Sequence, residues 1–136
     1  MIAYTAVGTN DMDAAKAFYA KFFEPMRARQ LVDIGRFVTF GTGPGAPMFG
    51  VCTPYDGEEA RPGNGTMVSL ACENPEAVER QHALALELGA VDEGAPGLRG
   101  GQFFMAYFRD LDGNKIALFA PAQIEAQIEA QIEANT

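Results

Sequence analysis

The chain has 136 residues, 48% of them hydrophobic, and a formal net charge of -8. This length suits one domain, or two small modules that share a core, and the composition provides ample apolar surface for burial. The excess of acidic side chains argues against nucleic acid as a partner, because its phosphates would be repelled. The longest apolar runs are far below the roughly 20 residues of a membrane span, so we expect no membrane partner.

The cysteines and the start of the chain bear on the compartment. Cys52 and Cys72 are the only two cysteines, and they lack CxxC spacing and a nearby histidine. We interpret them as small buried residues rather than as reactive groups. No charged segment precedes an apolar stretch at the start, so we expect a cytoplasmic protein with reduced thiols.

Residues 1–54 predict a first module of the order β-α-β-β-β. A short apolar run at 2–7 is followed by Asp11, a residue type that caps helices. Apolar residues then recur every three or four positions as far as Pro25, which indicates an amphipathic helix with one buried stripe. Three further apolar runs predict strands; they lie at 30–33, 36–40 and 48–53.

The same plan then occurs a second time. Residues 55–65, YDGEEARPGNG, are rich in glycine, proline and charge, and we interpret them as a linker. In the second module, residues 66–120, an apolar strand is followed by Asn74, which is suited to cap a helix. That helix is expected to stop at Gly89. Residues 121–136 form a separate tail.

Two apolar runs near the end of the second module, 103–108 and 115–119, flank the polar segment RDLDGN. Its Asp112-Gly113 pair is among the strongest short-range signals for a β-hairpin, and Asp110 can accept hydrogen bonds from amides of the turn. We interpret the segment as a tight turn with no chemistry of its own.

This hairpin carries a family resemblance. An aromatic strand, Arg-Asp-x-Asp-Gly-Asn and a closing Lys-Ile-x-Leu-Phe resemble the C-terminal hairpin of the glyoxalase / bleomycin-resistance / extradiol-dioxygenase superfamily, the vicinal oxygen chelate fold. The opening, IAYTAVGTNDMDAAKAFYAKFF, is similar to that family's first strand and helix, so the resemblance covers about residues 1–120. It implies an α+β fold in which two βαβββ modules form a curved mixed sheet around a cleft. It also implies a homodimer.

In that family four inward-facing side chains commonly hold a metal, usually as His, Glu or Gln. Carried over to this sequence, the four places fall on Tyr4, on Met48 or Gly50, on Met67 and on Ala117. None offers the imidazole or carboxylate that the usual divalent ions prefer, and a shift of register by one residue supplies none either. We therefore expect no metal and no cofactor.

The strands instead carry aromatic and sulfur side chains. Phe103, Tyr107, Met48 and Met67 would give the cleft an apolar, deformable wall suited to a small-molecule ligand, although core packing needs such residues equally. Tyr4 is the weak candidate for a catalytic residue: its phenol either contacts a ligand or acts as a general acid, or it bonds to backbone, and we favour the last.

Two arginines and the single histidine complete the candidates. Arg36 and Arg99 are the cations expected nearest the cleft mouth. Arg99 lies in APGLRGGQF, which we interpret as a glycine-rich loop over the site, where Arg99 either binds a ligand carboxylate or is simply solvated. His82 is on the second helix and is expected to be structural, packed at the boundary between helix and sheet or half exposed.

The tail contains Gln-Ile-Glu-Ala three times, a composition that favours helix. Ile124, Ile128 and Ile132 would form one stripe along it. A helix this short is marginal in water, so the stripe must dock on the body, pair with another chain, or fray. We expect a homodimer in which the tail takes part.

These observations favour a metal-free protein that binds a small apolar or aromatic molecule in the cleft. The alternative is a glyoxalase-like lyase or isomerase, or a dioxygenase-related enzyme, that works without the standard metal site; a third is a domain that acts only in assembly. The predicted ligand-binding residues are Tyr4, Met48, Gly50, Met67, Arg99, Phe103, Tyr107 and Ala117.

Overall fold

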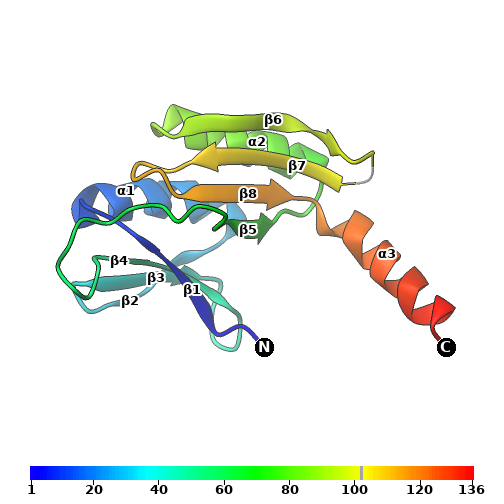
Figure 1. Ribbon diagram of the computed structural model, residues 1–136, viewed down its shortest axis with the longest axis horizontal. Helices are drawn as coiled ribbons and strands as arrows, with labels where there is room; N and C mark the ends of the chain where they lie inside the picture. The colour runs from blue at the N-terminus through cyan, green and yellow to red at the C-terminus, as the bar shows by residue number, and fades with distance from the viewer. Residues whose placement is uncertain (102) are drawn as a thin grey trace.

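The computed structural model describes the backbone of residues 1–101 and 103–136, and their side chains outside residues 121–125 (Figure 1). Within these residues the strands form two four-stranded sheets, sheet A in the order β1-β4-β3-β2 and sheet B in the order β5-β8-β7-β6. In each sheet the first strand pairs in parallel with the last strand of its module, and the other pairs are antiparallel. The predicted α+β fold of two βαβββ modules is confirmed.

The first module follows the predicted order closely. Its elements are β1 (Tyr4–Gly8), α1 (Met12–Phe23), the short 3₁₀ helix η1 (Glu24–Met26), β2 (Arg29–Asp33), β3 (Phe37–Gly41) and β4 (Met48–Cys52). Asp11 caps α1 as predicted, because its side chain accepts a hydrogen bond from the amide of Ala14 at 3.0 Å.

The second module has the same order, followed by one more helix. Its elements are β5 (Val68–Ala71), α2 (Pro75–Glu87), β6 (Val91–Arg99), β7 (Phe103–Arg109) and β8 (Lys115–Phe119), and α3 (Pro121–Ala134) follows. Asn74 caps α2 by accepting from the amide of Ala77 at 2.9 Å. Gly89 follows the end of the helix with a φ of 108°, a conformation that glycine adopts without strain.

The prediction of a glycine-rich loop at 95–103 is wrong over most of that range. The chain continues as β6 and pairs with β7, with irregular register on either side of Gly94. Pro96 is tolerated because β6 lies at the edge of sheet B, where a missing amide breaks no ladder. Among the described residues, the turn includes Gly100 and Gly101, which have φ values of 62° and 73°. Gln102 lies outside the described residues.

One core joins the two modules. Four aromatic side chains of α1 are its centre, and they contact aromatic residues of both sheets; the set comprises Phe18, Tyr19, Phe22, Phe23, Phe40, Phe49 and Phe108. Phe108 belongs to β7, so the first helix packs against the second module as well as its own. Each such side chain contributes about 1.5–3 kcal/mol by burial, and the modules therefore stabilise one another.

The predicted hairpin turn between β7 and β8 also links the modules. Asp110 is buried, and its carboxylate accepts hydrogen bonds from the Tyr19 hydroxyl at 2.6 Å and from the amides of Asp112 and Asn114 at 2.9 Å. The side-chain amide of Asn114 donates to the carbonyl of Gly8 at 2.8 Å. The interpretation of this segment as a turn alone missed its role in joining the two halves.

Burial raises the pKa of Tyr19 well above its ordinary value of 10, and the Asp110 carboxylate adds to the rise. Tyr19 therefore remains a hydrogen-bond donor to Asp110 in the folded protein. This bond connects α1 to a turn 91 residues away in the sequence.

The tail is helical, as predicted, and α3 extends away from the two sheets (Figure 1). Ile128 and Ile132 are 53% and 63% exposed, while the side chain of Ile124 lies outside the described part of the chain. The stripe at 128 and 132 is therefore not docked on the body. Among the described residues, no helix combines the length and apolar character needed to cross a bilayer.

Candidate functional site

Sheet A has one face packed on α1 and one face turned away from it, which we call open face A. The register places Tyr4 beside Met48, and Gly50 follows on the same face because side chains alternate along a strand. Phe49, between them, points into the core. Three of the predicted site residues, Tyr4, Met48 and Gly50, are thus brought together on open face A.

Tyr4 is 55% exposed, and its ring packs edge-to-face on Phe37 with 5.5 Å between ring centroids. The expected hydrogen bond from its hydroxyl to backbone is not found within the described residues. The phenol instead lies at an accessible aromatic surface, where it can contact a ligand.

Gly50 has no room for a side chain. A Cβ atom there would lie 2.8 Å from Cζ of Phe37 and 2.9 Å from the carbonyl oxygen of Thr5. The Phe37 ring therefore occupies the space that a side chain at position 50 would need.

Sheet B likewise has a face turned away from α2, which we call open face B. The register sets Ser69, Ala117, Tyr107 and Gly94 side by side across the four strands. Ala117 is fully buried, so neighbouring side chains cover it on this face. The row consists of small residues with one aromatic side chain, Tyr107, at its centre.

The remaining predicted residues of this half lie around that row. Phe103 and Arg99 are register partners at the end of the β6–β7 hairpin, and both are half-buried. Met67 precedes β5 and is 43% exposed. Open face B therefore includes Arg99, Phe103, Tyr107 and Ala117, with Met67 at its margin.

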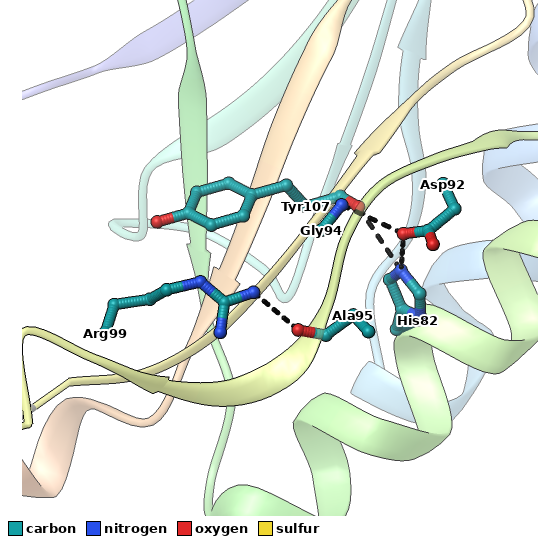
Figure 2. A network of polar contacts seen from close by, with 6 residues as sticks. All are labelled: His82, Asp92, Gly94, Ala95, Arg99 and Tyr107. Carbon is teal, nitrogen blue, oxygen red and sulfur yellow. Dashed lines mark hydrogen bonds and ion pairs between the residues drawn. The ribbon is translucent and has the colours of Figure 1, made fainter.

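Two cations lie over the Tyr107 ring. The Arg99 guanidinium carbon is 5.5 Å from the ring centroid, and Nζ of Lys115 is 5.1 Å from it. Figure 2 shows the guanidinium alongside the ring, where it donates to the carbonyl of Ala95 at 2.5 Å. The Tyr107 hydroxyl donates to the sulfur of Met105 at 3.3 Å, a weak acceptor.

His82 belongs to the layer beneath this site (Figure 2). It is buried, and Nε2 lies 3.1 Å from the Asp92 carboxylate and 3.2 Å from the Tyr107 carbonyl. The amide of Gly94 lowers the pKa of Asp92, and the His82 contact lowers it further. His82 thus has the structural position at the boundary between helix and sheet that the sequence predicts.

Arg36 precedes β3 and Cys72 belongs to the core, whereas Cys52, two positions after Gly50 and paired with Phe37, is on open face A. Arg36 donates to the carbonyl of Thr53 at 2.8 Å and lies over the ring of Tyr55 at 5.3 Å. Cys72 is buried, and burial raises the pKa of its thiol to about 11, so it is not a reactive thiolate. Cys52 is half-buried, and both thiols are free.

An apolar pocket of about 340 Å³ lies between the modules. Its walls come from the ends of β3 and β4, from β5 and from the segment after α1, and include Met48, Phe40, Phe49, Val68, Ser69 and Leu70. A second hollow, of about 540 Å³, is lined by the linker and by Met67, Arg109 and Lys115. Met48 lines the first hollow and Met67 the second, and neither hollow is lined by Tyr4 or Ala117.

The donor chemistry does not fit the metal site of the resembled family. In the part of the chain that the structure describes, no three His, Cys, Asp or Glu side chains gather in a way that could hold a metal ion. The carried-over positions provide a phenol at Tyr4, a thioether at Met48 or Met67, and no ligating atom at Ala117.

Comparison with known proteins decides the family. A model of the Glyoxalase/Bleomycin resistance protein/Dioxygenase superfamily matches residues 1–118. The chain belongs to this superfamily. A glyoxalase/bleomycin resistance protein from Albidiferax ferrireducens T118 is 31% identical, with a TM-score of 0.79, over 88% of this chain and 98% of that one.

More distant structures share the fold. A lactoylglutathione lyase from Agrobacterium tumefaciens is 20% identical, with a TM-score of 0.68, over 91% of this chain and 95% of that chain. TioX from Micromonospora sp. ML1 is 17% identical, with a TM-score of 0.64, over 88% of this chain and 98% of its own. The search of curated proteins finds no match.

Lys115, Ser69 and Gly94 are on open face B but are not among the predicted site residues. Lys115 begins β8 two positions before Ala117, so strand alternation alone places both on one face. That alternation was the signal available in the sequence.

Proposed function

We propose that this superfamily member binds a small apolar or aromatic molecule between its two modules, without a metal. The observation that carries the proposal is the chemistry of the carried-over ligand positions, where Tyr4, Met48 and Met67 present an aromatic and thioether surface. The pocket of about 340 Å³ beside Met48 supports it, since ligand sites are commonly apolar hollows of about 300–1,000 Å³.

A neutral aromatic probe tests binding. The chain has no tryptophan, so the fluorescence of 2-naphthamide can be followed without overlapping protein emission. We expect saturable binding and a rise in melting temperature, both lost in Met48→Asp, which places a charge at the pocket. Leu111→Asp, at an exposed apolar residue outside this pocket, is the matched control and should bind as the wild type does. No saturable binding to the wild type at millimolar probe would overturn the proposal.

Elemental analysis of the purified protein tests the metal-free part. We expect zinc, nickel, iron and manganese well below one equivalent per chain. One equivalent that is retained on dialysis, and lost on Tyr4→Phe, would show that these positions bind metal after all.

A second candidate is a metal-independent lyase or isomerase, and the accessible Tyr4 hydroxyl is the observation that favours it. A phenol can transfer a proton to a bound substrate when suitably placed. Turnover of methylglyoxal with glutathione that persists with chelator and disappears in Tyr4→Phe would replace the binding proposal with this one.

We also propose that the chain acts as a cytoplasmic homodimer. The exposed apolar residues Tyr4 and Met67 on the open faces support association, and two free thiols suit a reducing compartment. Sedimentation should give a dimer, and Met67→Glu should shift it toward monomer. Tyr55→Glu, at a residue 91% exposed elsewhere, should not. A wild-type monomer at 100 µM, roughly the level where weak dimers still form, would overturn this part.

A further inference from the structure

Open face B carries two cations, Arg99 and Lys115, that belong to none of the ion pairs found among the described residues. Arg99 and Lys115 are both half-buried and both lie over the Tyr107 ring. Among the described residues, neither forms an ion pair with a carboxylate. Arg109, on the same face, differs because it pairs with Glu93 at 2.9 Å. A half-buried charge without a counterion favours the binding of an anion.

The Arg99 side chain is held in place rather than free in solvent. One nitrogen donates to the Ala95 carbonyl, and the guanidinium lies across two glycines of its own strand. A Cβ atom at Gly94 or Gly97 would lie 3.3 or 3.2 Å from a guanidinium nitrogen, so both glycines provide the space. Since arginine has five N–H donors, most remain for a ligand in a fixed orientation.

Lys115 supplies the second charge from the neighbouring strand. It precedes Ala117 on the same face and lines the hollow of about 540 Å³ beside Met67. Glu93 is the nearby acid: its contact with Arg109 lowers its pKa most, and Lys115 lowers it a little further. The negative charge of Glu93 is therefore balanced mainly by Arg109. Positive charge remains around Tyr107, although the net charge of the chain is -8.

We propose that the bound molecule is an aromatic carboxylate. Its carboxylate is bound by Arg99, and Lys115 adds positive charge from β8, on the other side of β7. Its ring lies on open face B between Tyr107 and Ser69, and Ser69 also lines the apolar pocket. This inference rests on the proposed function and adds the charge of the ligand to it.

A matched pair of probes tests the charge. 2-Naphthoate and 2-naphthamide have the same ring system and differ in the charge of one group. We expect wild-type protein to bind the carboxylate at least about tenfold more tightly, as charge-assisted hydrogen bonds imply. Raising the ionic strength should weaken naphthoate binding and leave naphthamide binding unchanged.

Variants locate the effect. Arg99→Gln and Lys115→Gln should each weaken naphthoate binding about tenfold and leave naphthamide binding unchanged. Arg36→Gln is the matched control, because Arg36 also lies over a tyrosine ring, at 5.3 Å. That ring belongs to Tyr55, in the loop after β4. It should change neither affinity. Circular dichroism and melting temperature establish that each variant folds.

The outcomes separate this inference from the proposed function. Equal affinity of the wild type for both probes would overturn the inference and leave the apolar site intact, and this result needs no variant. No binding of either probe would overturn both. If Arg99→Gln changed sedimentation but neither affinity, the cations would serve contact between chains, and the inference would fail.

Discussion

The turn between β7 and β8 and open face B both carry polar groups, and the two regions differ in how completely those groups are paired. At the turn, the Asp110 carboxylate has partners on both oxygens, from its own turn and from Tyr19. On open face B, Arg99 and Lys115 lack acidic partners within the described residues. The comparison teaches that polar groups paired within the chain stabilise it, whereas the two cations outside the ion pairs are where we propose that a ligand binds.

The largest effect is expected at the turn. Asp110→Ala leaves the Tyr19 hydroxyl and two turn amides without their acceptor, and we expect the free energy of unfolding to fall by about 3–5 kcal/mol. Urea denaturation measures it. Asp112→Ala removes one exposed bond, from the amide of Asn10 at 2.9 Å, and should cost about 1 kcal/mol. Similar losses in the two variants would contradict the role given to Asp110.

The same chemical change in two tyrosines sharpens the comparison. Tyr19→Phe removes the buried donor to Asp110 and should lower the free energy of unfolding by about 1–3 kcal/mol. Tyr4→Phe removes an accessible hydroxyl and should change it by less than about 0.5 kcal/mol. Equal effects in denaturant melts would show that the two regions do not differ in this way.

The raised pKa of Tyr19 makes stability depend on alkaline pH. An unfolded tyrosine loses its proton near pH 10, while folded Tyr19 keeps it, so unfolding releases a proton and stability falls as the pH rises above about 10. The contribution is at most about 1.4 kcal/mol per pH unit. Unfolding measured from pH 9 to 11.5 should show a shallower decline in Tyr19→Phe. A Tyr19→Phe curve parallel to that of the wild type would contradict the assignment.

The smallest effect is expected for the tail. Because Ile128 and Ile132 are exposed, a chain that ends at Ala120 should unfold within about 1 kcal/mol of the full chain. Sedimentation of both chains then tests whether α3 takes part in the dimer. A loss of several kcal/mol would show that the tail is docked on the body.

Local features of the fold were predictable from the sequence because neighbouring residues determine them. Asp11 and Asn74 cap the helices that their positions predict, and Gly113 has the positive φ of the hairpin turn. The bond between Tyr19 and Asp110 was not predictable, since no local pattern pairs residues 91 positions apart. Its geometry depends on how α1 packs across both modules.

The candidate site was predictable only where strand alternation governs it. Tyr107 and Ala117 share a face, as expected from two antiparallel strands. Arg99 was placed in a loop because proline and glycines usually interrupt strands, whereas an edge strand with irregular register accepts them. Lys115 is not among the predicted site residues; it is the first residue of β8, next to the turn.

The packing around Gly50 limits which side chains this position can accept. The Cβ atom of any side chain introduced there would lie less than 3 Å from the Phe37 ring and the Thr5 carbonyl, so a single substitution would not place a metal ligand at this position. Phe37 would have to be replaced by a smaller residue, and β1, which contains Thr5, would have to move. A side chain at position 50 therefore requires several coordinated mutations, and Met48 is the neighbouring position on this face that already accepts one.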